Sequence, residues 1–225
     1  PQPAQPPQPE AIAPLHEAWD RLLRKHVNAS GKVNYKGFRA DKAALDTYLA
    51  ALATNPPAEG WSRAEKMAYW INAYNAFTID LITDNYPVAS IMNLDGGKTW
   101  DVKRIELGGK KYSLNQIEND ILRPQFKDAR IHFAVNCAAR SCPPLHNRAY
   151  TADNLATMLE QRTRQFVNDP KYNTLSEGKA QVSKIFEWYA ADFGNLREFL
   201  NRYAAAQVSG DAVIGFAEYD WALNE

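Results

Sequence analysis

The chain has 225 residues, of which 45% are hydrophobic and 12% aromatic, and its 26 basic and 26 acidic side chains leave a formal charge of zero. This length and apolar content allow one large domain or two small ones with a sizeable core. The balanced charge argues against a nucleic-acid partner, because binding to nucleic acid depends on neutralising phosphates. No apolar run approaches the roughly 20 residues that cross a bilayer, so no transmembrane segment is expected.

The chain begins with a segment rich in Pro and Gln, Pro-Gln-Pro-Ala-Gln-Pro-Pro-Gln-Pro-Glu. Such a composition cannot build a core, so residues 1–11 are expected to form a disordered tail before a single domain over residues 12–225. A tail of this kind is typical of an exported protein after signal cleavage, which favours a periplasmic or otherwise exported location. The alternative is an artificial chain boundary.

In the first half of the chain, apolar residues recur at helical spacing. This pattern predicts helices over residues 12–26, 41–52 and 64–82. The third of these begins at a capping box formed by Ser62 and Glu65. Because this helix is apolar on nearly all sides, it is expected to be central and buried.

The second half mixes strand and helix signals. Gly108 and Gly109 predict a hairpin, and a helix is expected to begin at Ser113 and to end at Pro124. The apolar run over residues 131–136 predicts a buried strand. The remaining expected elements are a helix over residues 151–167, a helix from Ser183, a helix over 196–203 and a strand over 212–216. The whole order favours an α+β fold with helices packed on a small antiparallel sheet.

Several separate motifs resemble those of one family. They are Trp70-Ile-Asn-Ala-Tyr-Asn-Ala76, Ser113-Leu-Asn-Gln-Ile-Glu118, the stretch from His132 to Leu145, Ser183-Lys-Ile-Phe-Glu-Trp-Tyr189, and Tyr219-Asp-Trp-Ala-Leu-Asn224. Together they are similar to the domain of unknown function 547 (DUF547), over most of the chain. The resemblance implies a single DUF547-like domain and supports export, but it implies no activity.

At the level of the fold, the chain also resembles transglutaminase-like and papain-like thiol enzymes. In those enzymes a buried helix packs on an antiparallel sheet and carries the nucleophilic Cys at its start. Here the buried helix offers Asn72 and Asn75 instead. Any thiol chemistry must therefore come from Cys137 or Cys142.

Both cysteines and two of the four histidines fall within residues 130–146. Cysteine is the strongest nucleophile among side chains, and a cationic Arg140 near Cys137 would favour its thiolate. Cys142 precedes two prolines, which stiffen its loop. Three interpretations of Cys137 stay open: a reactive thiol, half of a disulfide or redox pair with Cys142, or an inert core residue.

His132 is the candidate general base. In a strand, His132 and Cys137 would point to opposite faces, which counts against a direct pair. Glu118 could orient His132 or form an ion pair with Arg123, and the ion pair is favoured.

Asn72 and Asn75 share one face of the buried helix. They either tether neighbouring backbone or orient a catalytic imidazole, and the first interpretation is favoured. The aromatic residues of the chain, with Trp188, Tyr189 and Tyr219 among them, are interpreted as core. A groove for a glycan or a peptide would use aromatic residues as well.

His132, Cys137, Cys142 and His146 are ligand types that bind zinc, but their spacing lacks the C-x2-C knuckle of zinc loops. No metal site is expected. The sequence contains no P-loop and no dinucleotide-binding glycine motif, so no cofactor is expected either.

The leading hypothesis is an exported protein with a thiol-centred site, a Cys–His hydrolase or acyltransferase acting on the amide or peptide bonds of a small molecule or peptide. The catalytic candidates are Cys137, His132 and Glu118. The residues expected to bind or orient the substrate are Asn72, Asn75, Arg140 and Cys142. The alternatives are a non-catalytic binding module with a Cys137–Cys142 disulfide, and a thiol–disulfide redox protein.

Overall fold

The computed structural model describes residues 13–225 and combines helices with two small sheets, which confirms the predicted α+β class. The Pro- and Gln-rich tail lies outside the described residues, and the export inferred from it stays a prediction. Within residues 13–225, no helix is both long enough and apolar enough to cross a membrane. The α-helices are α1 (Ala13–His26), α2 (Tyr35–Ala40), α3 (Lys42–Thr54), α4 (Arg63–Asp84), α5 (Arg123–Phe126), α6 (Leu155–Asn168), α7 (Ile185–Trp188), α8 (Ala190–Phe193) and α9 (Leu196–Tyr203). The strands are β1 (Ile105–Leu107), β2 (Lys110–Tyr112), β3 (Thr174–Leu175), β4 (Lys179–Val182) and β5 (Val213–Phe216).

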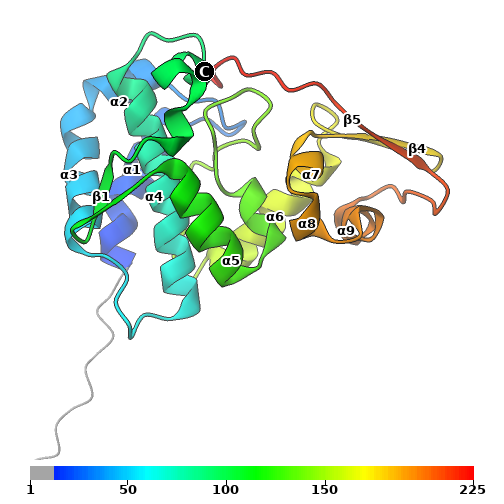
Figure 1. Cartoon of the computed structure of the whole chain (residues 1–225), viewed down its shortest axis with the longest axis horizontal. Coiled ribbons are helices and arrows are strands. Elements are labelled where there is room, and N and C mark those ends of the chain that lie inside the picture. Colours follow the sequence, from blue (N-terminus) through cyan, green and yellow to red (C-terminus); the bar gives the residue numbers. More distant parts are fainter. Residues whose placement is uncertain (1–12) are drawn as a thin grey trace, which may run out of the picture.

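Helices α1 to α4 form one side of the molecule, at the left of Figure 1. Helix α1 packs against α3 through Trp19 and Tyr48, whose stacked rings have centroids 5.7 Å apart. Helix α4 begins at the predicted capping box of Ser62 and Glu65. It packs against α2, α3 and the π-helical segment η4 (Gln116–Leu122), so the prediction of a buried central helix is confirmed. The short helix α2 was not predicted.

The antiparallel hairpin of β1 and β2 turns at Gly108 and Gly109, as predicted, and both glycines have positive φ. The prediction that Pro124 ends the next helix is wrong, because η4 passes directly into α5, which ends at Phe126. Pro124 is the second residue of α5, directly after the π-helical segment, and the helix continues through it. Lys127, with φ 45°, ends the helix instead.

The prediction of a buried strand over residues 131–136 is also wrong. Ala129–Phe133 form a 3-10 helix, η5, whose start is capped by the side chain of Asp128. The apolar run is buried as expected, but the backbone N–H of Asn136 donates to Asn75 Oδ1 of α4 and not to a neighbouring strand. Periodicity does not distinguish a short buried strand from a short buried helix.

The other side of the molecule carries the sheet β3-β4-β5, with α7, α8 and α9 beside it (Figure 1). Strands β3 and β4 pair antiparallel, the sense expected for the sheet as a whole, whereas β5 joins β4 in parallel. A parallel neighbour requires a crossover, and α7, α8 and α9 provide it. Strand β5 confirms the predicted closing strand, and β3 and β4 were not predicted.

The buried apolar side chains form two hydrophobic clusters. The first cluster is made of buried side chains from α1 to α4, the hairpin and η4. Trp19, Tyr48 and Tyr69 are among its large residues. The second cluster lies between α6, the three-stranded sheet and α9, and it is rich in Phe. Phe133 lies at the centre of this second cluster, with 1% of its surface exposed. It contacts the rings of Phe166, Phe186, Phe193 and Phe199.

After β5 the chain returns toward the first cluster, and residues 217–225 are called the return segment here (Figure 1). Backbone hydrogen bonds join it to that side. Among them, Arg140 N–H donates to Ala222 O, Val33 N–H donates to Asn224 O, and Leu223 N–H donates to Ala89 O. The return segment therefore crosses from one cluster to the other.

A thiol cavity as the candidate functional site

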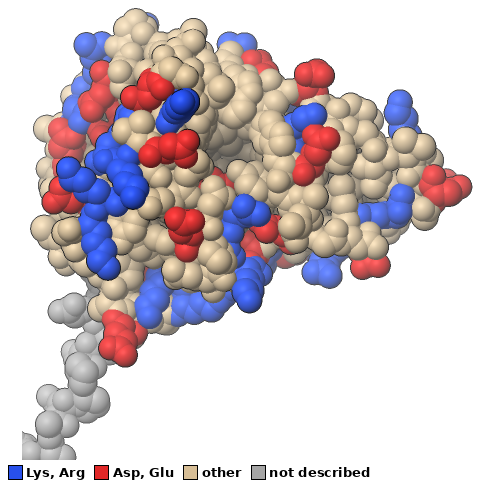
Figure 2. All heavy atoms as spheres, viewed as in Figure 1, with Lys and Arg blue, Asp and Glu red and all other residues tan. Residues whose placement is uncertain are grey.

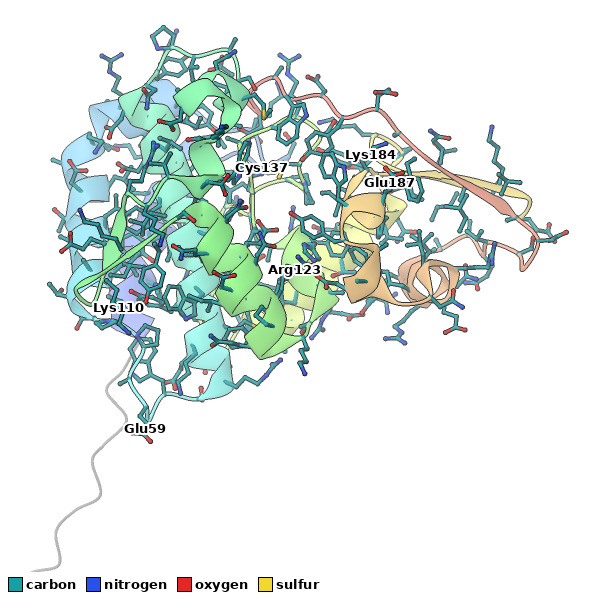
Figure 3. All side chains as sticks on the ribbon, in the orientation of Figure 1. Glu59, Lys110, Arg123, Cys137, Lys184 and Glu187 are labelled. Carbon is teal, nitrogen blue, oxygen red and sulfur yellow. The ribbon has the colours of Figure 1, made fainter. Side chains whose placement is uncertain are left out.

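A cavity of about 260 Å³ lies where the two clusters meet. Figure 2 shows the hollow in the middle of this face, with mainly uncharged atoms around it, and Figure 3 places Cys137 between α4 and α7. The side chains that line it come from α4, the segment before β1, η4, η5 and the loop after it, α7 and the return segment. They are Tyr74, Trp100, Asn115, Glu118, His132, Val135, Cys137, Cys142, Pro143, Ile185, Trp188, Tyr189, Tyr219 and Trp221.

Asn136 fixes the loop that carries both cysteines. Its Oδ1 accepts from the backbone N–H of Ala138 at 2.9 Å and from Asn224 Nδ2 at 3.1 Å. Its Nδ2 donates to Pro143 O at 2.9 Å. Ala138 has φ 63°, a strained value for a residue with a side chain, and it persists only where surrounding contacts enforce it. The amide of Asn136, which the sequence analysis did not single out, thus positions Cys137 at the cavity.

The two amides of α4 hold backbone behind the cavity. Asn75 Nδ2 donates to Ala134 O at 2.9 Å, and Asn75 Oδ1 accepts from Asn136 N–H at 2.8 Å. Asn72 bonds in the same way to both backbone groups of Tyr150, at 2.7 and 3.0 Å. Neither amide lines the cavity. Both amides therefore bond to neighbouring backbone, as in the tethering interpretation of Asn72 and Asn75.

The sulfurs of Cys137 and Cys142 lie 2.9 Å apart, beyond the roughly 2.05 Å of an S–S bond, and both residues are free thiols. Cys137 N–H also donates to Cys142 Sγ at 2.9 Å, and Tyr219 Oη lies 3.2 Å from Cys137 Sγ. The hydrogen bond with Cys142, and then that with Tyr219, lower the pKa of Cys137 although burial opposes this. Burial and the neighbouring Cys137 raise the pKa of Cys142. Cys137 is therefore the more acidic thiol of the pair.

His132 is 2% exposed and is held by a carboxylate. Its Nε2 lies 2.7 Å from Asp192 Oδ2, its Nδ1 lies 3.9 Å from Glu118 Oε1, and its ring stacks on Tyr189 at a centroid distance of 3.9 Å. The hydrogen bond with His132, together with Arg123, holds the pKa of Asp192 well below its usual range. One ring nitrogen is thus engaged, and the other has no hydrogen bond to Glu118.

The favoured ion pair between Glu118 and Arg123 is wrong. Arg123 donates to both carboxylate oxygens of Asp192, from Nε at 2.6 Å and from one terminal nitrogen at 3.0 Å. The π-helical turn of η4 is wider than an α-helical turn, and it directs Glu118 into the cavity while Arg123 reaches α8.

The structure brings four of the predicted site residues to one cavity: Cys137, Cys142, His132 and Glu118. His132 and Cys137 do not point apart as expected, because the segment that joins them is not a strand. Among residues 13–225, the hydrogen-bond partners of Cys137 Sγ are Cys142 and Tyr219, and His132 is not one of them.

Arg140 lies outside the cavity. It is exposed, its Nε donates to Leu223 O at 3.3 Å, and it lies 3.9 Å from Asp220. The cause of the lowered pKa of Cys137 is the neighbouring thiol and phenol, and not Arg140 as the sequence suggested.

Sequence reasoning missed Asp192 and the role of Tyr219. Asp192 lies in the four-residue helix α8, which has no amphipathic pattern to single it out, and Tyr219 was interpreted as core with the other aromatic residues. The interpretation as core is also wrong for Trp188, which is 46% exposed at the cavity. The only available signal was that these residues stand within or next to the motifs that resemble DUF547.

Of the four side chains with zinc-ligand chemistry, His146 is the one that does not line the cavity. Burial and the nearby Arg162 lower the pKa of His146 to about 4. Within the part of the chain that the structure describes, no three His, Cys, Asp or Glu side chains gather as a set that could hold a metal ion.

Comparison with known proteins gives one match. The family described as "Protein of unknown function, DUF547" matches residues 58–167, which contain both cysteines, His132 and Glu118. No curated protein and no solved structure matches the chain. The motifs after residue 167 lie beyond the matched segment, and the resemblance to transglutaminase-like and papain-like folds stays a prediction. Residues 58–167 therefore match the DUF547 family, which the sequence motifs predicted.

Proposed function

We propose that the chain is a thiol-dependent hydrolase or acyltransferase in which Cys137 is the nucleophile and His132 is the general base. The observation that carries the proposal is a cysteine of lowered pKa in the same cavity as an imidazole held by a carboxylate. A thiol that ionises more readily than usual and an oriented imidazole are the two groups that covalent acyl transfer uses.

In this proposal Asp192 takes the orienting role that the sequence suggested for Glu118. It holds His132 through Nε2, so Nδ1 is the atom that exchanges protons. Cys137 gives its proton to Nδ1 and attacks the acyl carbon of an amide. The C–N bond breaks as His132 returns the proton to the leaving amine, and a thioester remains on Cys137. Water or an amine then attacks the thioester and gives a proton to His132. The C–S bond breaks, the acyl group leaves as a carboxylic acid or a new amide, and His132 returns the proton to Cys137.

Acetylation by p-nitrophenyl acetate tests the proposal without knowledge of the natural substrate. The reagent should release a burst of p-nitrophenol and leave one acetyl group, which peptide mass mapping assigns to Cys137. His132→Ala should slow the burst about a hundredfold, the low end of general-base effects. Cys142→Ala serves as the control that keeps the Cys137 thiol. Equal acetylation of both cysteines, or a His132→Ala variant as fast as the parent, would overturn the proposal.

A thiol–disulfide redox function is the second candidate, and the 2.9 Å between the two sulfurs is the observation that favours it. In this reaction Cys137 and Cys142 lose two electrons and two protons to form a disulfide, and a disulfide co-reactant of the glutathione type is reduced to two thiols. Equilibration in glutathione buffers, followed by alkylation and mass measurement, gives the reduction potential. A potential within the range of redox-active dithiols, with no burst of acetylation, favours this candidate. A disulfide that stays closed in all these buffers, again with no burst, favours the binding module.

A further inference from the structure

Four aromatic rings gather at the mouth of the thiol cavity. They come from three separate parts of the chain: Trp100 from the loop before the hairpin, Trp188 from α7, and Tyr219 and Trp221 from the return segment. Trp188 lies 4.8 Å from Tyr219 and 5.9 Å from Trp221, between ring centroids. Tyr219 lies 4.6 Å from Trp221, and Trp100 lies 5.7 Å from Trp221. These residues are called the aromatic mouth.

One carboxylate faces the cavity behind the aromatic mouth. Glu118 is 5% exposed, and no Lys or Arg is among the lining side chains. Asp192 is paired with Arg123, whereas the ion-pair contact of Glu118 within residues 13–225 is His132 at 3.9 Å. A buried carboxylate without a close cation is costly, because the low-dielectric surroundings replace water poorly. The cavity is therefore built to receive positive charge.

We propose that the aromatic mouth and Glu118 bind an alkylammonium group of the substrate, with a quaternary or otherwise methylated nitrogen as the best fit. The faces of Trp and Tyr rings attract such cations, and sets of them form the aromatic cages that recognise quaternary ammonium ligands. Glu118 adds the opposite charge at the inner end. An anionic group would be repelled by Glu118, and a neutral apolar group would gain no attraction from that carboxylate. The inference rests on the proposed function in that it names the substrate class of the same site.

Binding of choline and of 3,3-dimethylbutan-1-ol, its neutral carbon isostere, separates charge from shape. The measurement is the quenching of tryptophan fluorescence of the full chain carrying Cys137→Ala, at constant ionic strength. Choline should bind about tenfold more tightly than the isostere, as a desolvated cation–π contact predicts. Because this variant lacks the nucleophile, its binding result is independent of the acetylation test, and either proposal can fail alone.

Variants of Glu118 and Trp188 test which side chains cause the preference for choline over the isostere. Glu118→Gln should weaken choline binding about tenfold and leave the isostere unchanged, whereas the matched control Glu187→Gln should change neither. Glu187 is an exposed carboxylate on α7 that pairs with Lys184 outside the cavity (Figure 3). Trp188→Leu, at a half-exposed position that tolerates change, should also weaken choline selectively. Equal affinity for the two ligands, no binding of either, or a Glu118→Gln variant that keeps the preference would overturn the inference.

Discussion

The two hydrophobic clusters of this molecule position different residues of the candidate site. The first is built from long helices, and two buried amides of its helix α4 bond to backbone. Asn75 holds Ala134 and Asn136, just before the cysteines, and Asn72 holds Tyr150, after their loop. The second is built from short helices and a Phe-rich centre, and next to it stands Asp192, whose carboxylate bonds to His132. The thiols thus belong to one side and their candidate acid–base partner depends on the other. The difference shows that the site exists only where the two sides meet.

The segment that matches the family also contains only some of the residues of the candidate site. Residues 58–167 include the cysteine loop, His132 and Glu118, whereas Asp192 and Tyr219 come after the matched segment. The return segment then brings Tyr219 back to within 3.2 Å of Cys137 Sγ. The chemistry proposed for the matched segment therefore depends on side chains from outside it.

The largest expected effect comes from a substitution at the centre of the second cluster. Phe133→Ala should lower the free energy of unfolding by about 3–5 kcal/mol, because a fully buried ring surrounded by four others leaves a large cavity. Urea denaturation measures the change. Val213→Ala, at a position 70% exposed, is the control and should stay within about 0.5 kcal/mol. A loss below about 1 kcal/mol for Phe133→Ala would mean that this cluster does not stabilise the fold.

The corresponding test in the first cluster is Asn72→Ala. This change leaves the backbone N–H and C=O of Tyr150 buried without partners, and should cost about 2–3 kcal/mol in urea denaturation. Asn85→Ala, an exposed amide after the end of α4, serves as the control and should cost less than about 1 kcal/mol. Similar losses from both variants would contradict a special role for the buried tether.

Asp192→Asn tests the contact between Asp192 and His132, where the two sides of the molecule meet, through the pH dependence of stability. The folded pKa of Asp192 is lowered, so its carboxylate stabilises the fold above the ordinary carboxyl pKa of about 4, and this contribution is lost as the pH falls toward the lowered value. The parent should therefore be about 1.5 kcal/mol more stable than the variant at pH 7. Urea denaturation at several pH values should show the gap closing below about pH 4. A gap that does not vary with pH would refute the assignment.

The smallest expected effect concerns the pair of thiols. Cys142→Ala removes the hydrogen bond that most lowers the pKa of Cys137, so that pKa should rise and alkylation of Cys137 at pH 7 should slow about threefold. The alkylation rate with iodoacetamide as a function of pH, followed at the Cys137 peptide, measures the shift. Cys142→Ser keeps a donor and should fall between the parent and the alanine variant. Unchanged or faster alkylation of the alanine variant would count against the hydrogen bond as the cause.

Part of the candidate site could be predicted because its residues lie close together in the sequence. The cysteines and His132 stand within one short stretch, and Glu118 belongs to a motif with its own capping box. The strand predicted over residues 131–136 was wrong because an apolar run records burial and not backbone geometry. That error also produced the argument that His132 and Cys137 point apart.

Local sequence alone determined the elements whose signals are local: the amphipathic helices, the capping box of α4, the glycine turn of the hairpin and helix α9. Only the tertiary structure decided which side chains surround the thiols. Asp192 reaches His132 across 60 residues and Tyr219 reaches Cys137 across 82. Such pairings arise from the packing of the two clusters and the course of the return segment, and no spacing along the chain encodes them. The contact with Tyr219 adds to the effect of Cys142 in lowering the pKa of Cys137, and the packing of the two clusters decides which side chains line the cavity.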